Sequence, residues 1–316
     1  MEEMYIPEIH MCNGVCWKSN YGGILMNRLL INFSYILKTS FKWTASFFAI
    51  LGFIGTFTPL EELINYSEKL WKKILISILI LVGIWVVSFI IISLITHYKK
   101  QYTILDVNNH KVFVQYGDLF SSDEVSDTKN RNIVVPVNRC FDTLVDDDLI
   151  SSNTLHGMAI NKLISEGYTR ENIDDLIDSN LMSQKCQYSL INANNKRSGK
   201  LKRYPVGTVA EVKATDDCNY FLLGLSSFDE NLVANVSDDE YVLALSRLIE
   251  FCNKRSQQYP VVMPIIGGGL SRTGKSEREI LEYLVSLIKL NKNKLHYDLY
   301  IVVRENGRST IPIVDL

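Results

Sequence analysis

Ile74–Thr96 reads ILISILILVGIWVVSFIIISLIT, an unbroken run of 23 residues without a charged side chain. As an α-helix it would be about 34 Å long, since each helical residue adds about 1.5 Å. The hydrocarbon core of a bilayer is about 30 Å thick, so such a helix could cross it with some tilt. Interfacial residue types flank both ends: Lys69, Trp71, Lys72, Lys73, His97, Tyr98, Lys99 and Lys100. The run predicts a membrane-spanning helix.

A second uncharged stretch, Trp43–Leu60 (WTASFFAILGFIGTFTPL), lies 13 residues before the first. Its 18 residues are near the lower limit for a membrane span, and small residues such as Gly52 and Gly55 would let another helix approach closely. Together the two stretches predict a two-helix transmembrane hairpin within residues 41–100, with spans of about 43–60 and 74–96. Residues 1–40 form an N-terminal segment that could lie along the membrane interface. Basic residues outside both spans favour a multi-pass protein of the inner cell membrane with its soluble part in the cytoplasm.

Residues 101–316 differ from this segment in charge. They hold 24 basic and 29 acidic side chains, against 9 and 6 in residues 1–100. This balance argues against nucleic acid as a partner. The six cysteines are scattered, and Cys12 and Cys16 near His10 have no second pair of ligands, so we expect no metal site. Scattered single thiols are also typical of a reducing cytosol.

Apolar residues in 101–316 alternate between the spacing of strands and that of helices. Expected strands are Tyr102–Asp106, Lys111–Tyr116, Asn132–Val137, Thr208–Val212, Tyr220–Leu225, Val261–Ile266 and His296–Val303. Expected helices contain Ala159–Ile164 and Ile173–Leu181, and two more begin at the capping boxes Ser237–Glu240 and Ser276–Glu279. The pattern predicts a three-layer α/β domain with a buried central sheet. Residues 194–203 (NNKRSGKLKR) are expected to be a solvated basic loop.

Gly269–Ser276 (GLSRTGKS) fits the P-loop pattern G-x4-G-K-[ST], between an expected strand and an expected helix. However, only 40 residues follow Ser276, whereas a nucleoside triphosphatase places most of its sheet and its Mg²⁺-binding acid downstream. A P-loop NTPase that uses Lys275 therefore stays an alternative. In either case Gly267–Gly269 would offer backbone N–H groups to a phosphate.

Several short stretches follow one another in a recognisable order: Val112–Phe120 (VFVQYGDLF), Ile133–Asn138 (IVVPVN) with Gly157–Ile160 (GMAI), Tyr204–Thr208 (YPVGT) and Pro264–Leu270 (PIIGGGL). In this order they resemble the macro domain, a module that binds ADP-ribose, over about residues 102–305. The resemblance implies that Asp118 recognises the adenine amino group and that the loop after Pro264 cradles the diphosphate. The implied ligand-binding residues are Asp118, Leu119, Asn138, Asn153, Thr154, Leu155, His156, Tyr204, Pro205, Gly207, Thr208, Gly267, Gly268, Gly269, Leu270 and Ser271.

The first ligand loop, which runs from Asn138 to the helix start at Gly157, departs from the macro pattern. Members that remove ADP-ribose usually carry a run of glycines before the helix, whereas Leu149–Gly157 (LISSNTLHG) has only the last one. Arg139 and Cys140 also stand where the family usually has small residues. We therefore expect binding without catalytic residues, and a membrane-tethered ADP-ribosyl hydrolase stays an alternative. His156 is either a ligand contact or a solvated loop histidine.

A membrane hairpin in front of a macro domain resembles, as a whole, the membrane effector of type II Thoeris antiphage systems. The resemblance implies a partner TIR-domain enzyme that makes an ADP-ribose derivative, histidine-linked ADP-ribose, during infection. The effector would bind this signal, form a homo-oligomer and disrupt the lipid membrane, causing abortive infection. No cofactor is implied beyond this nucleotide ligand.

Overall fold

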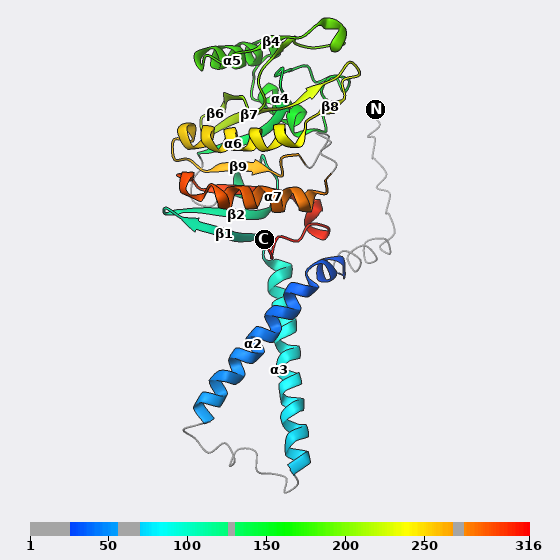
Figure 1. The fold of residues 1–316 in the computed structure, drawn as a ribbon, viewed down its shortest axis with the longest axis vertical. Helices are drawn as coiled ribbons and strands as arrows, with labels where there is room; N and C mark the ends of the chain where they lie inside the picture. Colours follow the sequence, from blue (N-terminus) through cyan, green and yellow to red (C-terminus); the bar gives the residue numbers. More distant parts are fainter. Residues whose placement is uncertain (1–25, 56–69, 126–129, 268–274) are drawn as a thin grey trace, which may run out of the picture. The chain divides into compact units, whose positions relative to one another are not determined.

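The structure, a computed structural model, describes residues 26–55, 70–125, 130–267 and 275–316. The chain forms two compact units that divide between Lys99 and Lys100 (Figure 1). The described part of the first unit consists of helices, and the second unit contains both helices and strands.

Two long helices make up most of the described first unit: α2 (Phe33–Gly55) and α3 (Leu70–Tyr98). They run antiparallel, because Phe33 meets Phe89, while Phe41, further along α2, stacks on Trp85, further back along α3. Most large apolar side chains of α3 are exposed. A helix that is apolar all round requires an apolar environment, such as lipid, to be stable.

Among the described helices, only α3 holds a segment long and apolar enough to cross a membrane, Ile74–Tyr98. The expected first span, Trp43–Leu60, falls partly on α2, and residues 56–60 lie outside the described residues. Because α2 already begins at Phe33, it also contains Lys38 and Lys42, which dilute its apolar character. One candidate membrane span is therefore supported, and a transmembrane hairpin is not established.

The second unit is built on a mixed sheet in the order β1-β2-β10-β9-β3-β7-β6, with β8 paired to β7. The strands from β2 to β7 in this order pair in parallel, whereas β1, β6 and β8 pair antiparallel with their neighbours. Their bounds are β1 Gln101–Val107, β2 His110–Gly117, β3 Arg131–Asn138, β6 Val209–Thr215, β7 Cys218–Phe228, β8 Ala234–Asn235, β9 Val261–Pro264 and β10 Leu299–Arg304.

Helices cover both faces of this sheet (Figure 1). Their bounds are α4 Leu155–Ser165, α5 Arg170–Ser183, α6 Asp238–Arg255 and α7 Glu277–Leu290. Successive strand residues point to opposite faces, so Val134 packs in one core with residues of α6 and α7, and Val135 packs in the other with residues of α4 and α5. The predicted three-layer α/β architecture is confirmed.

The local sequence signals agree with the observed elements. Each expected strand is present, although the one expected over Val261–Ile266 ends at Pro264, which has no N–H to continue the ladder. Both predicted capping boxes are formed, at Ser237 before α6 and at Ser276 before α7. The short ribbon of β4 (Ser189–Leu190) and β5 (Lys202–Arg203) was not predicted.

Candidate functional site

The predicted ligand segments meet at one edge of the sheet. The carboxyl ends of β2, β10, β9, β3 and β7 lie at this edge, because these strands pair in parallel. Asp118 follows β2, Asn138 ends β3, and Gly267 follows β9. The Tyr204–Thr208 turn lies there too, since β6 begins opposite the end of β7. Ligands of open α/β sheets bind at this edge.

The turn after β2 leaves the Asp118 carboxylate accessible. Its Oδ1 accepts a hydrogen bond from the N–H of Phe120 (3.1 Å), and the side chain is exposed. The Asp118 N–H donates to the Glu124 carboxylate (2.8 Å), which lies over Gly117 so closely that a Cβ there would overlap it. The neighbouring Leu119 is buried in the core, so only its backbone could reach a ligand.

The side chain of Asn138 stabilises the start of the first loop through its oxygen, while its amide nitrogen donates no hydrogen bond. Its Oδ1 accepts from the N–H of Cys140 (2.9 Å), and its side chain is 3% exposed. The Nδ2 amide is buried and has no hydrogen-bond partner. A buried donor without a partner costs about 1–3 kcal/mol, so a ligand or water that accepts from Nδ2 would be favoured. Burial raises the pKa of the Cys140 thiol, which argues against a reactive thiolate.

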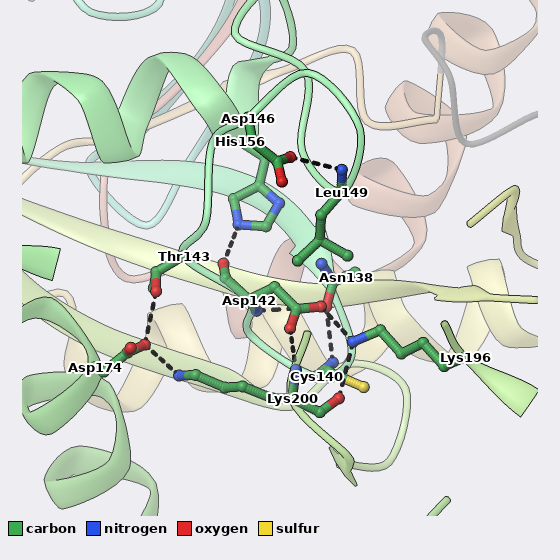
Figure 2. A network of polar contacts seen from close by, with 10 residues as sticks. All are labelled: Asn138, Cys140, Asp142, Thr143, Asp146, Leu149, His156, Asp174, Lys196 and Lys200. Carbon is green, nitrogen blue, oxygen red and sulfur yellow. Dashed lines mark hydrogen bonds and ion pairs between the residues drawn. The ribbon is translucent and has the colours of Figure 1, made fainter. Parts of the chain in front are cut away.

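A buried ion pair fixes the middle of the first loop (Figure 2). Lys196 Nζ lies 2.6 Å from Asp142 Oδ2, and both side chains are 1% exposed. The other carboxylate oxygen of Asp142 accepts the N–H of Lys200 (2.6 Å), while Lys196 also donates to the Lys200 carbonyl (2.8 Å). Gly199 allows this contact, because a Cβ there would overlap the Asp142 carboxylate.

These contacts correct the expectation that residues 194–203 form a solvated loop. Lys196 lies in the protein interior, and Lys200 extends the network through an ion pair with Asp174 (2.5 Å). Asp174 also accepts from the Thr143 hydroxyl (2.8 Å), so the basic segment is attached to both the first loop and α5. Sequence reasoning missed Asp142 and Lys196, and the glycine between Lys196 and Lys200 was the one available sign of a tight turn.

His156 belongs to the same network. It is buried in the first turn of α4, and its Nε2 lies 2.9 Å from the Asp142 carbonyl (Figure 2). Burial lowers the pKa of His156 to about 4, so the ring is neutral near pH 7 and Nε2–H can donate to that carbonyl. A solvated loop histidine is therefore wrong, and contact with a ligand stays a prediction.

The residues before His156 cap the N-terminus of α4. The Thr154 hydroxyl caps α4 by accepting the N–H of Gly157 (3.0 Å), and it donates to the Ser151 carbonyl (2.7 Å). Asn153 is exposed and Leu155 is half-buried. Asn153 is therefore accessible to a ligand, while the Thr154 side chain is already engaged.

The Tyr204–Thr208 turn is fixed by close packing. Tyr204 is buried against Phe141, whereas Pro205 is exposed and its carbonyl accepts from both the N–H and the hydroxyl of Thr208. Gly207 has φ +78°, and a Cβ there would lie 2.9 Å from Ala244 Cα in α6. Glycine is required on both grounds.

The second loop begins at Gly267, which is buried with φ +93°. Gly268, Gly269, Leu270 and Ser271 lie outside the described residues. Lys275 forms an ion pair with Asp238 (2.5 Å), and the Ser276 hydroxyl caps α7 and donates to Glu279 (2.7 Å). Both P-loop side chains therefore contact acidic residues in this structure, and the NTPase stays an alternative.

The described residues contain no group of three or more histidine, cysteine or acidic side chains that could hold a metal ion. His10, Cys12 and Cys16 lie outside them. The cysteines in the described ranges are free thiols: Cys140, Cys186, Cys218 and Cys252.

Comparison with known proteins adds an independent observation. Residues 112–304 match the protein family described as "Thoeris protein ThsA, Macro domain". The chain is 27% identical over 260 residues to the Thoeris protein ThsA of Bacillus amyloliquefaciens (strain Y2), covering 81% of each sequence. Among solved structures it is similar to a macrodomain mutant from Oceanobacillus iheyensis, with 10% identity, a TM-score of 0.38, and coverage of 66% of this chain and 87% of that chain.

Proposed function

Because this chain belongs to the Thoeris ThsA macro domain family, we propose that it is a membrane effector of antiphage defence that binds an ADP-ribose derivative. The observation that carries the proposal is the position of the predicted ligand segments. Asp118, Asn138, the Tyr204–Thr208 turn and Gly267 lie at one sheet edge, within the matched residues 112–304. ADP-ribose-type binding is the function that this arrangement supports best.

The arrangement of the donors and acceptors fits an extended dinucleotide-like ligand. Asp118 follows β2 and Asn138 ends β3, and β10 and β9 lie between these two strands in the sheet. With about 4.8 Å between neighbouring strands, the two positions are about 14 Å apart. A ligand that reaches both must carry an amino donor at one end, for Asp118, and an acceptor near the other, for the unpaired Nδ2 of Asn138. Adenine and a ribose hydroxyl meet these requirements.

The membrane part of the proposal rests on α3. Its segment Ile74–Tyr98 is long and apolar enough to span a bilayer, and most of its large apolar side chains are exposed. We infer insertion into the inner cell membrane, with α2 as a second crossing and the α/β unit in the cytoplasm. The close aromatic contacts between Phe41 and Trp85 support a paired arrangement of the two helices.

The signal and its source extend the proposal. We infer that a TIR-domain enzyme makes the ligand during infection, that the preferred derivative is histidine-linked ADP-ribose, and that binding drives homo-oligomerisation and membrane disruption. Binding without turnover is favoured over ADP-ribosyl hydrolysis for one local reason. The first loop is held by the buried Asp142–Lys196 pair, and it has no glycine before α4, since Gly157 lies in the first turn of that helix. It therefore lacks the flexible glycine run expected of hydrolytic members.

The test is a calorimetric titration of ADP-ribose into the full chain in lipid nanodiscs. We expect saturable binding of ADP-ribose, no release of ADP-ribose from an ADP-ribosylated peptide and no phosphate release from ATP. The same preparation carrying Lys254→Ala, an exposed lysine paired only with Glu250 in the same helix, serves as the control. Turnover of the peptide would favour the hydrolase, turnover of ATP the NTPase, and absence of ADP-ribose binding would contradict the proposal.

A further inference from the structure

The first turn of α6 contacts the start of the first loop and residues on either side of the second loop. Glu240, the third residue of α6, accepts from Arg139 Nη1 at 2.8 Å, and Arg139 directly follows Asn138 in the first loop. Tyr241 is buried and its hydroxyl donates to the Ile266 carbonyl (2.7 Å), just before Gly267. Asp238 pairs with Lys275, just after the second loop. One helical turn therefore contacts the first loop and both Ile266 and Lys275.

Arg139 connects the third segment to the same turn. Its Nε donates to the Tyr204 carbonyl (2.8 Å), while the backbone N–H of Tyr204 donates to the Arg139 carbonyl (2.9 Å). The backbone N–H of Arg139 in turn donates to the Ser226 carbonyl at the end of β7 (2.8 Å). The guanidinium is mostly buried, and its planar fork holds the two hydrogen bonds in fixed directions.

The Arg139–Glu240 contact has no evident role in forming α6 itself. The capping box uses the other Glu240 oxygen, Oε2, which accepts from the N–H of Ser237 (3.3 Å). The helix start is also supported by the Ser237 hydroxyl and by the acidic Asp238 and Asp239. Oε1 is therefore left to accept from Arg139, the residue that directly follows Asn138.

We propose that Arg139 and Glu240 are positioning residues that set the first loop against α6, whose Tyr241 also holds the backbone just before Gly267. This inference rests on the proposed function and deepens it, since it concerns the affinity of the same site. When the pair is broken, the first loop next to Asn138 loses this attachment to α6, whereas the Tyr204–Thr208 turn keeps its own contact with α6 through Arg247. The ligand must then order the start of the first loop on binding, which weakens its affinity.

The test is a double-mutant cycle on the full chain in nanodiscs, with ADP-ribose as the probe in calorimetry. Arg139→Gln and Glu240→Gln should each weaken binding about tenfold, and the double variant should be no weaker than either single variant, because both remove one interaction. The matched control is Asp239→Asn. It removes a negative charge from the preceding residue, whose side chain is exposed. It should change the affinity less than about twofold.

Exchanging the charges of Arg139 and Glu240 distinguishes a positioning role of the pair from a general effect on the stability of the domain. Arg139→Glu combined with Glu240→Arg should recover part of the affinity that Arg139→Glu alone loses, while the melting temperatures of Glu240→Gln and Asp239→Asn should agree. If Glu240→Gln binds as tightly as Asp239→Asn, or if the double variant loses about a hundredfold, the inference is overturned. Absence of binding by the unmodified chain would instead overturn the proposed function, and the inference with it.

Discussion

Replacing Lys196 by methionine is expected to lower the free energy of unfolding of the α/β unit by about 3–5 kcal/mol. The substitution leaves the Asp142 carboxylate buried without its cation, since both side chains are 1% exposed. Methionine fills a similar volume, so the loss reflects the uncompensated charge more than a cavity. Because single domains are stable by only about 5–15 kcal/mol, this is a large part of the total. Urea unfolding of residues 101–316, with linear extrapolation to water, measures it.

Two companion variants test whether the uncompensated charge of Asp142 causes this loss of stability. Arg197→Met breaks the neighbouring ion pair with Asp148, which is exposed to solvent, and should cost less than about 1 kcal/mol. Adding Asp142→Asn to Lys196→Met should recover much of the loss, because the amide is neutral and its oxygen can still accept from Lys200 N–H. If Lys196→Met costs no more than Arg197→Met, the buried pair does not stabilise the first loop as described.

Asp118→Ala should weaken ADP-ribose binding by about 1.5–3 kcal/mol, or about 10- to 150-fold, since hydrogen bonds to charged groups contribute about that much. The exposed carboxylate is the acceptor expected for the adenine amino group. Its Oδ1 is already used by Phe120 N–H, so the outer oxygen is the one left for the ligand. Calorimetry with ADP-ribose on the full chain gives the affinity.

Asp118→Asn distinguishes ligand recognition from turn formation. Asparagine keeps an oxygen for Phe120 N–H but presents a second donor where the ligand needs an acceptor, so its loss should match that of alanine. Asp123→Ala, an exposed carboxylate a few residues along in the following 3₁₀ turn, is the control and should bind normally. Unchanged affinity of a folded Asp118→Asn variant would contradict the role assigned to Asp118.

The α/β architecture follows from signals that are local in the sequence. The capping boxes at Ser237 and Ser276 depend on residues three positions apart, and both form as predicted. The change between strand and helix periodicity depends on neighbouring residues as well. The strands of the main sheet could therefore be anticipated, except the two-residue β8, and so could the helices that cover it. Their parallel pairing then places Asp118 and Asn138 at a common edge without any knowledge of the loops.

The interior of the site depends on pairs that are distant in the sequence. Lys196 and Asp142 are 54 positions apart, and a lysine in a run of basic residues gives no sign that it is buried. Arg139 and Glu240 are 101 positions apart. His156 illustrates the same limit, because its burial depends on how the loop folds back from Asp142. Such contacts require the tertiary structure.

The short connection between the two units bears on the central proposal, which is that ligand binding clusters the chains and thereby disrupts the membrane. Helix α3 ends at Tyr98 and β1 begins at Gln101, so only Lys99 and Lys100 lie between them. Even fully extended, this connection spans only about 10 Å. Clustering of the α/β units on ligand binding must therefore displace the attached helices. A ligand can drive this change only by binding more tightly to the clustered state than to the resting state.

Membrane potential in cells tests this claim most directly. A potential-sensitive dye would be followed in cells that produce the full chain or residues 101–316, each with and without the TIR-domain enzyme proposed to make the ligand. The account predicts depolarisation only with the full chain and the active enzyme together, and its loss in the full chain carrying Asp118→Asn. Depolarisation by the full chain without the enzyme, or by residues 101–316 alone, would contradict it.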